Sequence, residues 1–135
     1  MSYPITDIEG IDGEAAARLK SARIRSTARL LDAAATLKGR KALADKTGLH
    51  PKNLLCWANM ADRMRIKGIS KEYAELLQAA GVETVRELKH RNPAKLAAAM
   101  AAANRARKLV RVLPSEKTVA RWIGEAKTLP LKISY

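Results

Sequence analysis

The chain carries one sequence pattern twice, and this internal repeat restricts the fold more than any other feature. Ile8-Glu9-Gly10-Ile11 is repeated as Ile66-Lys67-Gly68-Ile69, and the residues that follow keep the correspondence, with Leu19 matching Leu77. Each copy reads as an apolar residue, a turn at Gly-Ile, a helix with apolar positions four apart, a break and a second helix. Such self-similarity predicts two copies of one supersecondary unit, here a helix-hairpin-helix.

We therefore predict an all-α protein in which two tandem four-helix repeats, each containing a helix-hairpin-helix motif, pack as one compact body. The first repeat spans residues 1–65 and the second spans residues 66–127, while residues 128–135 form a tail that can lie across the body in extended form. Short polar side chains, which cap helix N-termini, precede the helices of both motifs. These residues are Asp12, Ser26, Ser70 and Thr84.

The composition agrees with small, closely packed helices. Phe is absent and aromatic residues make up 4% of the 135 residues, so Leu, Ile, Val and Ala must fill the core. The sequence has no apolar run of about 18 residues and no signal-peptide pattern, which predicts a soluble, cytoplasmic protein with no membrane segment. The single cysteine, Cys56, cannot form an internal disulfide, and we expect its thiol to be buried or half-buried.

The paired tryptophans, Trp57 and Trp122, occupy matching places in the last helix of each repeat. Exposed tryptophans can stack on nucleic-acid bases, but matching positions on two amphipathic helices favour packing in the core or between the repeats. The tryptophans lie farther apart in the sequence than the hairpins do, so the second repeat has gained residues. The gain falls in or near residues 104–111, which we call the basic insertion.

Charge is the most informative bulk property. The chain has 26 Lys and Arg against 13 Asp and Glu, a net charge of +13, which suggests a polyanionic partner. The surplus lies in the segments that follow the hairpins, and the densest part is the basic insertion. Its cations are Arg105, Arg107, Lys108 and Arg111. They could neutralise phosphates without reading bases, although a solvated loop or helix end is the structural alternative. A looser cluster in the first repeat contains Lys38, Arg40, Lys41 and Lys46.

The two Ile-x-Gly-Ile hairpins resemble the helix-hairpin-helix family of non-sequence-specific DNA-binding modules. Over nearly its whole length the chain resembles more closely DUF4332, an uncharacterised bacterial family with the same doubled plan. The residues that carry this resemblance are the hairpins, the junction at residues 59–65, the helix start at Arg91-Asn92-Pro93 and the paired tryptophans. The resemblance implies the fold, and it implies no activity because that family has no settled biochemical role.

The hairpins are the candidate phosphate sites that the resemblance implies. DNA-binding members read Gly-hydrophobic-Gly, and their backbone N–H groups hold a phosphate together with the start of the next helix. Asp12 replaces the last glycine in the first hairpin (residues 8–12) and would cap the helix itself, whereas Ser70 in the second hairpin (residues 66–70) lies between two lysines. The alternative is that both hairpins are purely structural turns. The candidate nucleic-acid-binding residues are Gly10, Lys67, Gly68, Ile69, Ser70, Lys71, Arg105, Arg107, Lys108 and Arg111.

Catalytic patterns are lacking, so we expect no enzyme activity, no cofactor and no metal site. His50 and His90 lack the spaced ligands of a zinc site, and no phosphate-cradling loop or serine elbow is present. We predict a non-catalytic, sequence-independent nucleic-acid-binding module, with DNA the expected partner. The alternative is a protein-interaction or scaffold module with the same fold. A continuous basic face that includes the hairpins would favour nucleic acid, whereas scattered charge around an apolar patch would favour a protein partner.

Overall fold

Helices dominate the regular structure of the chain in the computed structural model, which describes residues 2–135. The N-terminal half (residues 2–65) contains the 3-10 helix η1 (Ile5–Asp7) and the helices α1 (Gly13–Ser21), α2 (Thr27–Ala34), α3 (Leu37–Thr47) and α4 (Pro51–Arg63). The C-terminal half (residues 66–135) contains α5 (Lys71–Ala79), α6 (Val85–Leu88), α7 (Pro93–Arg107) and α8 (Glu116–Thr128). The described residues form no extended strand, so the predicted all-α class is confirmed.

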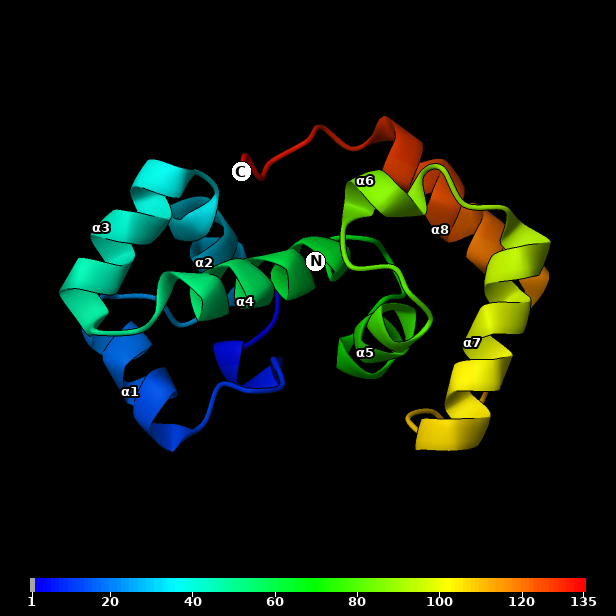
Figure 1. Cartoon of the computed structure of the whole chain (residues 1–135), viewed down its shortest axis with the longest axis horizontal. Coiled ribbons are helices and arrows are strands. Elements are labelled where there is room, and N and C mark those ends of the chain that lie inside the picture. The colour runs from blue at the N-terminus through cyan, green and yellow to red at the C-terminus, as the bar shows by residue number, and fades with distance from the viewer. Residues whose placement is uncertain (1) are drawn as a thin grey trace.

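Helix α4 runs through the middle of the molecule and joins its two ends. Figure 1 shows α1, α2 and α3 grouped around the N-terminal part of α4, and α7 and α8 beyond its C-terminal end. Helix α4 packs against α2 and α3 in its own half and against α5 and α6 in the other. The buried Leu, Ile, Val and Ala side chains of both halves form one cluster, which confirms the single compact body. None of the described helices has the length and apolarity needed to span a membrane.

The helix boundaries follow from local residue preferences. The Asp12 carboxylate accepts a hydrogen bond of 2.8 Å from the Ala15 N–H at the start of α1, and the Thr84 hydroxyl caps α6 in the same way. Ser70 was expected to cap α5 and does not. It occupies the N-cap position, but its hydroxyl makes a 3.3 Å hydrogen bond to the Glu72 side chain and no bond to a backbone N–H. The Ser70 hydroxyl therefore bonds to a neighbouring carboxylate and not to the start of the helix.

The tryptophans and the cysteine differ in their burial. Trp57 is 8% exposed and Trp122 is 1% exposed, so both belong to the core as their matching positions predict. The expectation that Cys56 is buried was wrong, because its thiol is exposed. Successive residues of an α-helix point about 100° apart. Cys56 therefore shares a face of α4 with Lys52 and Asn53, four and three residues earlier, which are exposed as well.

Arg63, at the end of α4, ties the two halves together. It is fully buried, and its guanidinium donates hydrogen bonds to the Ala74 carbonyl of α5 and to the Glu83 carbonyl before α6. Burial lowers the pKa of Arg63 to about 10, which leaves the side chain charged at neutral pH. Leaving a buried guanidinium without hydrogen-bond acceptors is energetically costly, so these two hydrogen bonds hold the C-terminal half against α4.

The last residues cross back from α8 onto the N-terminal half (Figure 1). The Ser134 N–H donates to the Ala35 carbonyl, and the Tyr135 hydroxyl donates to the Asn59 side chain. Arg40 of α3 is buried and donates to the Ser134 carbonyl at 2.7 Å. The tail is therefore extended across the body as predicted. Arg40 does not contribute to a basic surface, because its charge is enclosed by backbone carbonyls.

Candidate nucleic-acid interface

The two hairpins have the same backbone. Gly10 and Gly68 have φ angles of 94° and 92°, which lie in the left-handed region that favours glycine. In each hairpin the N–H of the isoleucine after this glycine donates to the carbonyl three residues earlier, at 3.2 Å for Ile11 and 3.0 Å for Ile69. The repeated sequence thus gives repeated turns at the level of single hydrogen bonds.

Each hairpin rests on the matching tryptophan. A Cβ atom on Gly10 would lie 3.1 Å from Trp57 Nε1, and one on Gly68 would lie 3.3 Å from Trp122 Nε1. There is little room for a side chain at either position, and the positive φ disfavours one as well. The paired tryptophans therefore support the hairpins from the core side and are not available for stacking on bases.

The first hairpin is surrounded by carboxylates. Glu9, Asp12 and Glu14 lie in or beside it, and no lysine or arginine belongs to this stretch of sequence. The Asp12 carboxylate accepts from the Ala15 N–H at the start of α1, and the nearby Arg18 is paired with Glu14 at 2.6 Å. Gly10, a predicted candidate, thus lies on a turn that leads into a helix already capped by a carboxylate.

The second hairpin is surrounded by cations from three elements. Lys67 and Lys71 are exposed on either side of the turn. Arg121 of α8 reaches the same turn, with Nη2 3.5 Å from the position of a Cβ on Gly68. Sequence reasoning missed Arg121. The available signal was its place one residue before Trp122, which matches Cys56 before Trp57 in the first half.

The backbone N–H groups of the second hairpin divide into two sets. The Lys67 N–H donates to the Glu125 carboxylate at 3.2 Å, and the Ile69 N–H closes the turn, so neither is open to a ligand. The Ile69 side chain is fully buried and anchors the hairpin in the core. The first turn of α5 has no side-chain cap, because Ser70 bonds elsewhere. This helix start, flanked by Lys71, keeps the electrostatic features of an anion site.

The basic insertion folds back onto α5. Helix α7 continues to Arg107, within the basic insertion, and Lys108 ends it with a left-handed φ of 52°. The Asn104 side chain then holds Val110 by two hydrogen bonds of 2.9 and 3.0 Å. The neighbouring Val112 carbonyl accepts a 2.8 Å hydrogen bond from the Tyr73 hydroxyl of α5.

This fold-back brings part of the basic insertion to the first turn of α5, the helix that follows the second hairpin. A shallow pocket of about 430 Å³ is lined by Glu72 and Tyr73, in the first turn of α5, and by residues 109–112, which include Arg111. Arg107 lies close enough to Glu75 of α5 for its positive charge to lower the pKa of that carboxyl. Arg105 and Lys108 are exposed, and no contact within the described residues links them to the hairpin.

Carboxylates on α5 lie among these cations. Burial, followed by the like charges of Glu9 and Glu72, raises the pKa of Glu75, while Lys71 and Arg107 lower it. The surface around the second hairpin is therefore basic at its edges and carries acidic groups along α5. Within residues 2–135, no group of three His, Cys, Asp or Glu side chains is arranged to hold a metal ion.

A family model covers both hairpins, both tryptophans and the basic insertion. The model describes a domain of unknown function, DUF4332, and it matches residues 9–129. The chain belongs to this family. Comparison of this DUF4332 chain with curated proteins and with solved structures gave no match. DUF4332 membership therefore assigns no activity to the chain.

Proposed function

We propose that this DUF4332 chain is a non-catalytic, sequence-independent nucleic-acid-binding module whose expected ligand is duplex DNA. The observation that carries the proposal is the fold-back of the basic insertion onto the first turn of α5, directly after the second hairpin. The Tyr73 hydroxyl bonds to the Val112 carbonyl, which places Arg111 beside the first turn of the helix that Lys71 opens. Arg121 adds a third source of positive charge.

This arrangement suits a phosphate better than a base. The uncapped start of α5 offers backbone N–H groups and the partial positive charge of a helix N-terminus. Lys67, Lys71 and Arg121 are long, exposed cations that can each contact a phosphate oxygen. Such contacts position a duplex without reading its sequence. The module would hold the backbone of nucleic acid through the second hairpin.

The carboxylates on α5 limit the strength of this interaction. Glu72 and Glu75 lie among the cations, and Glu125 already accepts from the Lys67 N–H. Non-specific complexes typically have dissociation constants of about 10⁻⁴ to 10⁻⁶ M at physiological salt. We expect this chain to bind in that range, and more tightly at low salt.

The test is fluorescence anisotropy with a labelled duplex of arbitrary sequence and a matching single strand, at several salt concentrations. The test variant replaces the cations of the basic insertion, namely Arg105, Arg107, Lys108 and Arg111, with Ala. The control variant removes the same number of exposed cations from the N-terminal half, namely Lys20, Arg25, Lys38 and Lys41. We expect log-linear weakening with salt and a much larger loss in the test variant, because about one counterion is released per phosphate contact. Equal losses, or no binding at low salt, would overturn the proposal.

A protein-interaction module is the second candidate function. The observation that favours it is an apolar groove with a cationic rim in the N-terminal half, at the end of the molecule opposite α7. The two functions do not compete for one surface, because the second hairpin and this groove belong to different halves. Each can therefore be tested with variants that leave the other surface intact.

A further inference from the structure

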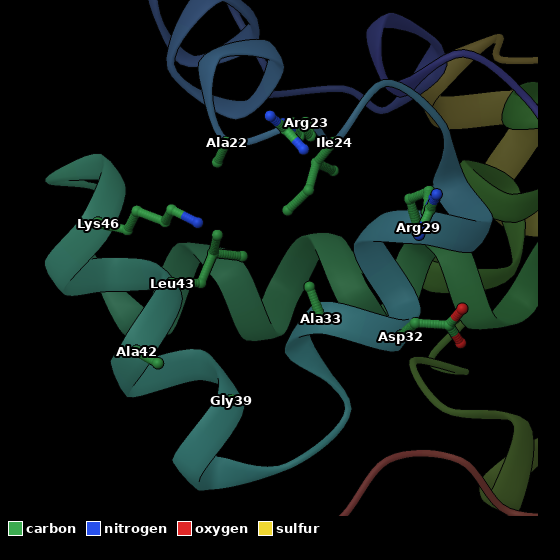
Figure 2. Close-up of a pocket in the computed structure, with 10 residues that line it drawn as sticks. All are labelled: Ala22, Arg23, Ile24, Arg29, Asp32, Ala33, Gly39, Ala42, Leu43 and Lys46. Atoms are coloured by element: carbon green, nitrogen blue, oxygen red, sulfur yellow. The ribbon is translucent and has the colours of Figure 1, made fainter.

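An open groove of about 610 Å³ lies between the α1–α2 connection, α2 and α3. Its floor is apolar and includes Ile24 and Leu43, with alanines on both walls. Figure 2 shows Lys46 extending from α3 toward the α1–α2 connection, and Ile24 pointing into the same space. Arg23 and Arg29 complete the cationic rim. The groove thus combines apolar contact area with three positive charges.

The rim cations have no partner in the part of the chain that the structure describes. The side chains of Arg23, Arg29 and Lys46 make no hydrogen bond and no ion pair among residues 2–135. The acidic group of the groove, Asp32, is paired at 3.0 Å with Lys132 of the C-terminal tail, and in Figure 2 it points away from the groove. The rim is therefore complementary to an anionic partner.

One of these cations stands at a strained backbone position. Arg23 has a φ of 67°, in the left-handed region where a side chain is unfavourable. The matching residue of the second repeat is Gly81, with a φ of 96°. The same turn therefore accepts glycine, yet the N-terminal half places an arginine there, at the edge of the groove.

The matching region of the C-terminal half is built differently. Arg91 stands where the groove has Ala33, and its guanidinium lies 3.9 Å from the position of a Cβ on Gly81. A large side chain thus covers the turn in the C-terminal half, whereas the small side chain of Ala33 leaves space in the N-terminal half. The open groove is a specific property of α1–α3 and does not follow from the repeat.

We propose that this groove docks an acidic amphipathic helix of a protein partner. Apolar side chains on one face of such a helix would cover Ile24 and Leu43, and flanking carboxylates would meet Arg23, Arg29 and Lys46. A nucleic-acid backbone would leave the apolar floor unused, and a small molecule requires a more enclosed cavity than this groove provides. The inference does not rest on the nucleic-acid proposal, because it concerns the other half of the molecule.

The probe is a fluorescein-labelled synthetic peptide of about 15 residues, with leucines on one helical face and glutamates beside them. A scrambled peptide of the same composition, without helical periodicity, is the control. Anisotropy measures affinity, and the amide shifts of the ¹⁵N-labelled protein locate the site. We expect saturable binding of the helical peptide and shifts at Ala22, Ile24 and Ala42.

Two variants test the groove without threatening the fold. Ala42→Glu adds a negative charge at an exposed wall position of α3, and we expect about tenfold weaker binding. Arg23→Gly removes a rim cation and relieves the left-handed strain, and we expect about fivefold weaker binding by a protein at least as stable. The matched control is Lys108→Gly, which also removes a cation from a left-handed backbone position. Lys108 lies far from the groove, so peptide affinity should be unchanged.

Three results would overturn the inference. The first is equal binding of the helical and scrambled peptides, which would indicate charge attraction alone. The second is a set of amide shifts at residues 67–71 with none in the groove. The third is a change in the chemical shifts of the same groove amides when duplex DNA is added, with no change when the peptide is added. Thermal unfolding of each variant shows whether a lost signal comes from a lost fold.

Discussion

The two hairpins have one backbone and different flanking charges. Gly10 and Gly68 share their left-handed conformation and their contact with a tryptophan, yet carboxylates flank the first in the sequence and lysines flank the second. Asp12 closes the start of α1, whereas Ser70 leaves the start of α5 without a side-chain cap. The turn geometry is thus set by glycine and core packing, and the side chains around it decide which hairpin can bind an anion.

The left-handed positions at the other turns show the same separation of backbone from side chain. The N-terminal half has an arginine at one such position, Arg23, and a glycine at the other, Gly48. The C-terminal half reverses this choice, with Gly81 and then Lys108. Both halves keep the two turns and place one cation at a strained turn, but at different ends of the repeat.

The largest effect on stability is expected where the hairpins are alike. Gly10→Ala and Gly68→Ala should each destabilise the protein by about 1–3 kcal/mol, because Ala is strained at positive φ and meets a tryptophan ring. Urea unfolding measures the loss. Gly124→Ala, in an exposed part of α8 with open space around the glycine, is the control and should stabilise by about 0.5–1 kcal/mol. A large difference between the two hairpin variants would contradict the equivalence of their backbones.

A smaller effect is expected where the hairpins differ. Asp12→Ala should destabilise the protein by about 1 kcal/mol, because the Ala15 N–H loses its cap. Ser70→Ala should change the free energy of unfolding by less than about 0.5 kcal/mol, since its hydroxyl bonds to the exposed Glu72 and caps nothing. The same denaturation experiment measures both. Similar losses in the two variants would show that Ser70 caps α5 in solution.

Replacing the two cations at left-handed backbone positions with glycine should stabilise the protein modestly. Arg23→Gly and Lys108→Gly are each expected to stabilise by roughly 0.5–1 kcal/mol, because glycine accepts the positive φ that arginine and lysine resist. The reverse change, Gly48→Arg, should destabilise, since an added Cβ would lie 2.7 Å from Arg18 Nη1. Thermal unfolding at one protein concentration compares them. A loss of stability in either glycine variant would contradict the strain assigned to these turns.

The smallest expected effect concerns the acidic groups of α5. Because the pKa of Glu75 is raised, its proton is held more tightly in the folded protein than in the unfolded chain. The protonated Glu75 carboxyl therefore contributes stability below the pKa that it has in the unfolded chain. This contribution is lost as the pH rises through the pKa that it has in the folded protein. In Glu75→Gln this pH dependence should shrink, and DNA affinity at low salt should rise about two- to threefold. Anisotropy at matched pH values checks this, and Glu83→Gln before α6 is the control.

Local rules predicted much of this fold from the sequence. The glycine turns, the Asp12 and Thr84 caps and the start of α7 at Pro93 all depend on a few adjacent residues. Ser70 escaped this reasoning because Glu72 competes for its hydroxyl, and the sequence does not show which acceptor wins.

The candidate site was harder to predict because it depends on tertiary contacts. Arg121 reaches the second hairpin through the packing of α8, and Arg111 reaches α5 through the Tyr73 hydrogen bond to the basic insertion. Arg40 was counted as a surface cation, but the C-terminal tail encloses it. A pattern of charges in sequence shows how many cations exist, and only the packing of helices shows which of them share a surface.

In the proposed function, the second hairpin carries the phosphate-binding surface of the molecule. The most direct measurement is the salt dependence of duplex binding by Lys67→Glu/Lys71→Glu, beside Lys20→Glu/Arg25→Glu, which changes the net charge equally in the N-terminal half. We predict more than about tenfold weaker binding and a salt slope smaller by about 2 for the hairpin variant, with little change in slope for the control. Equal weakening and equal slopes in the two variants would show that binding follows net charge, and would contradict the account.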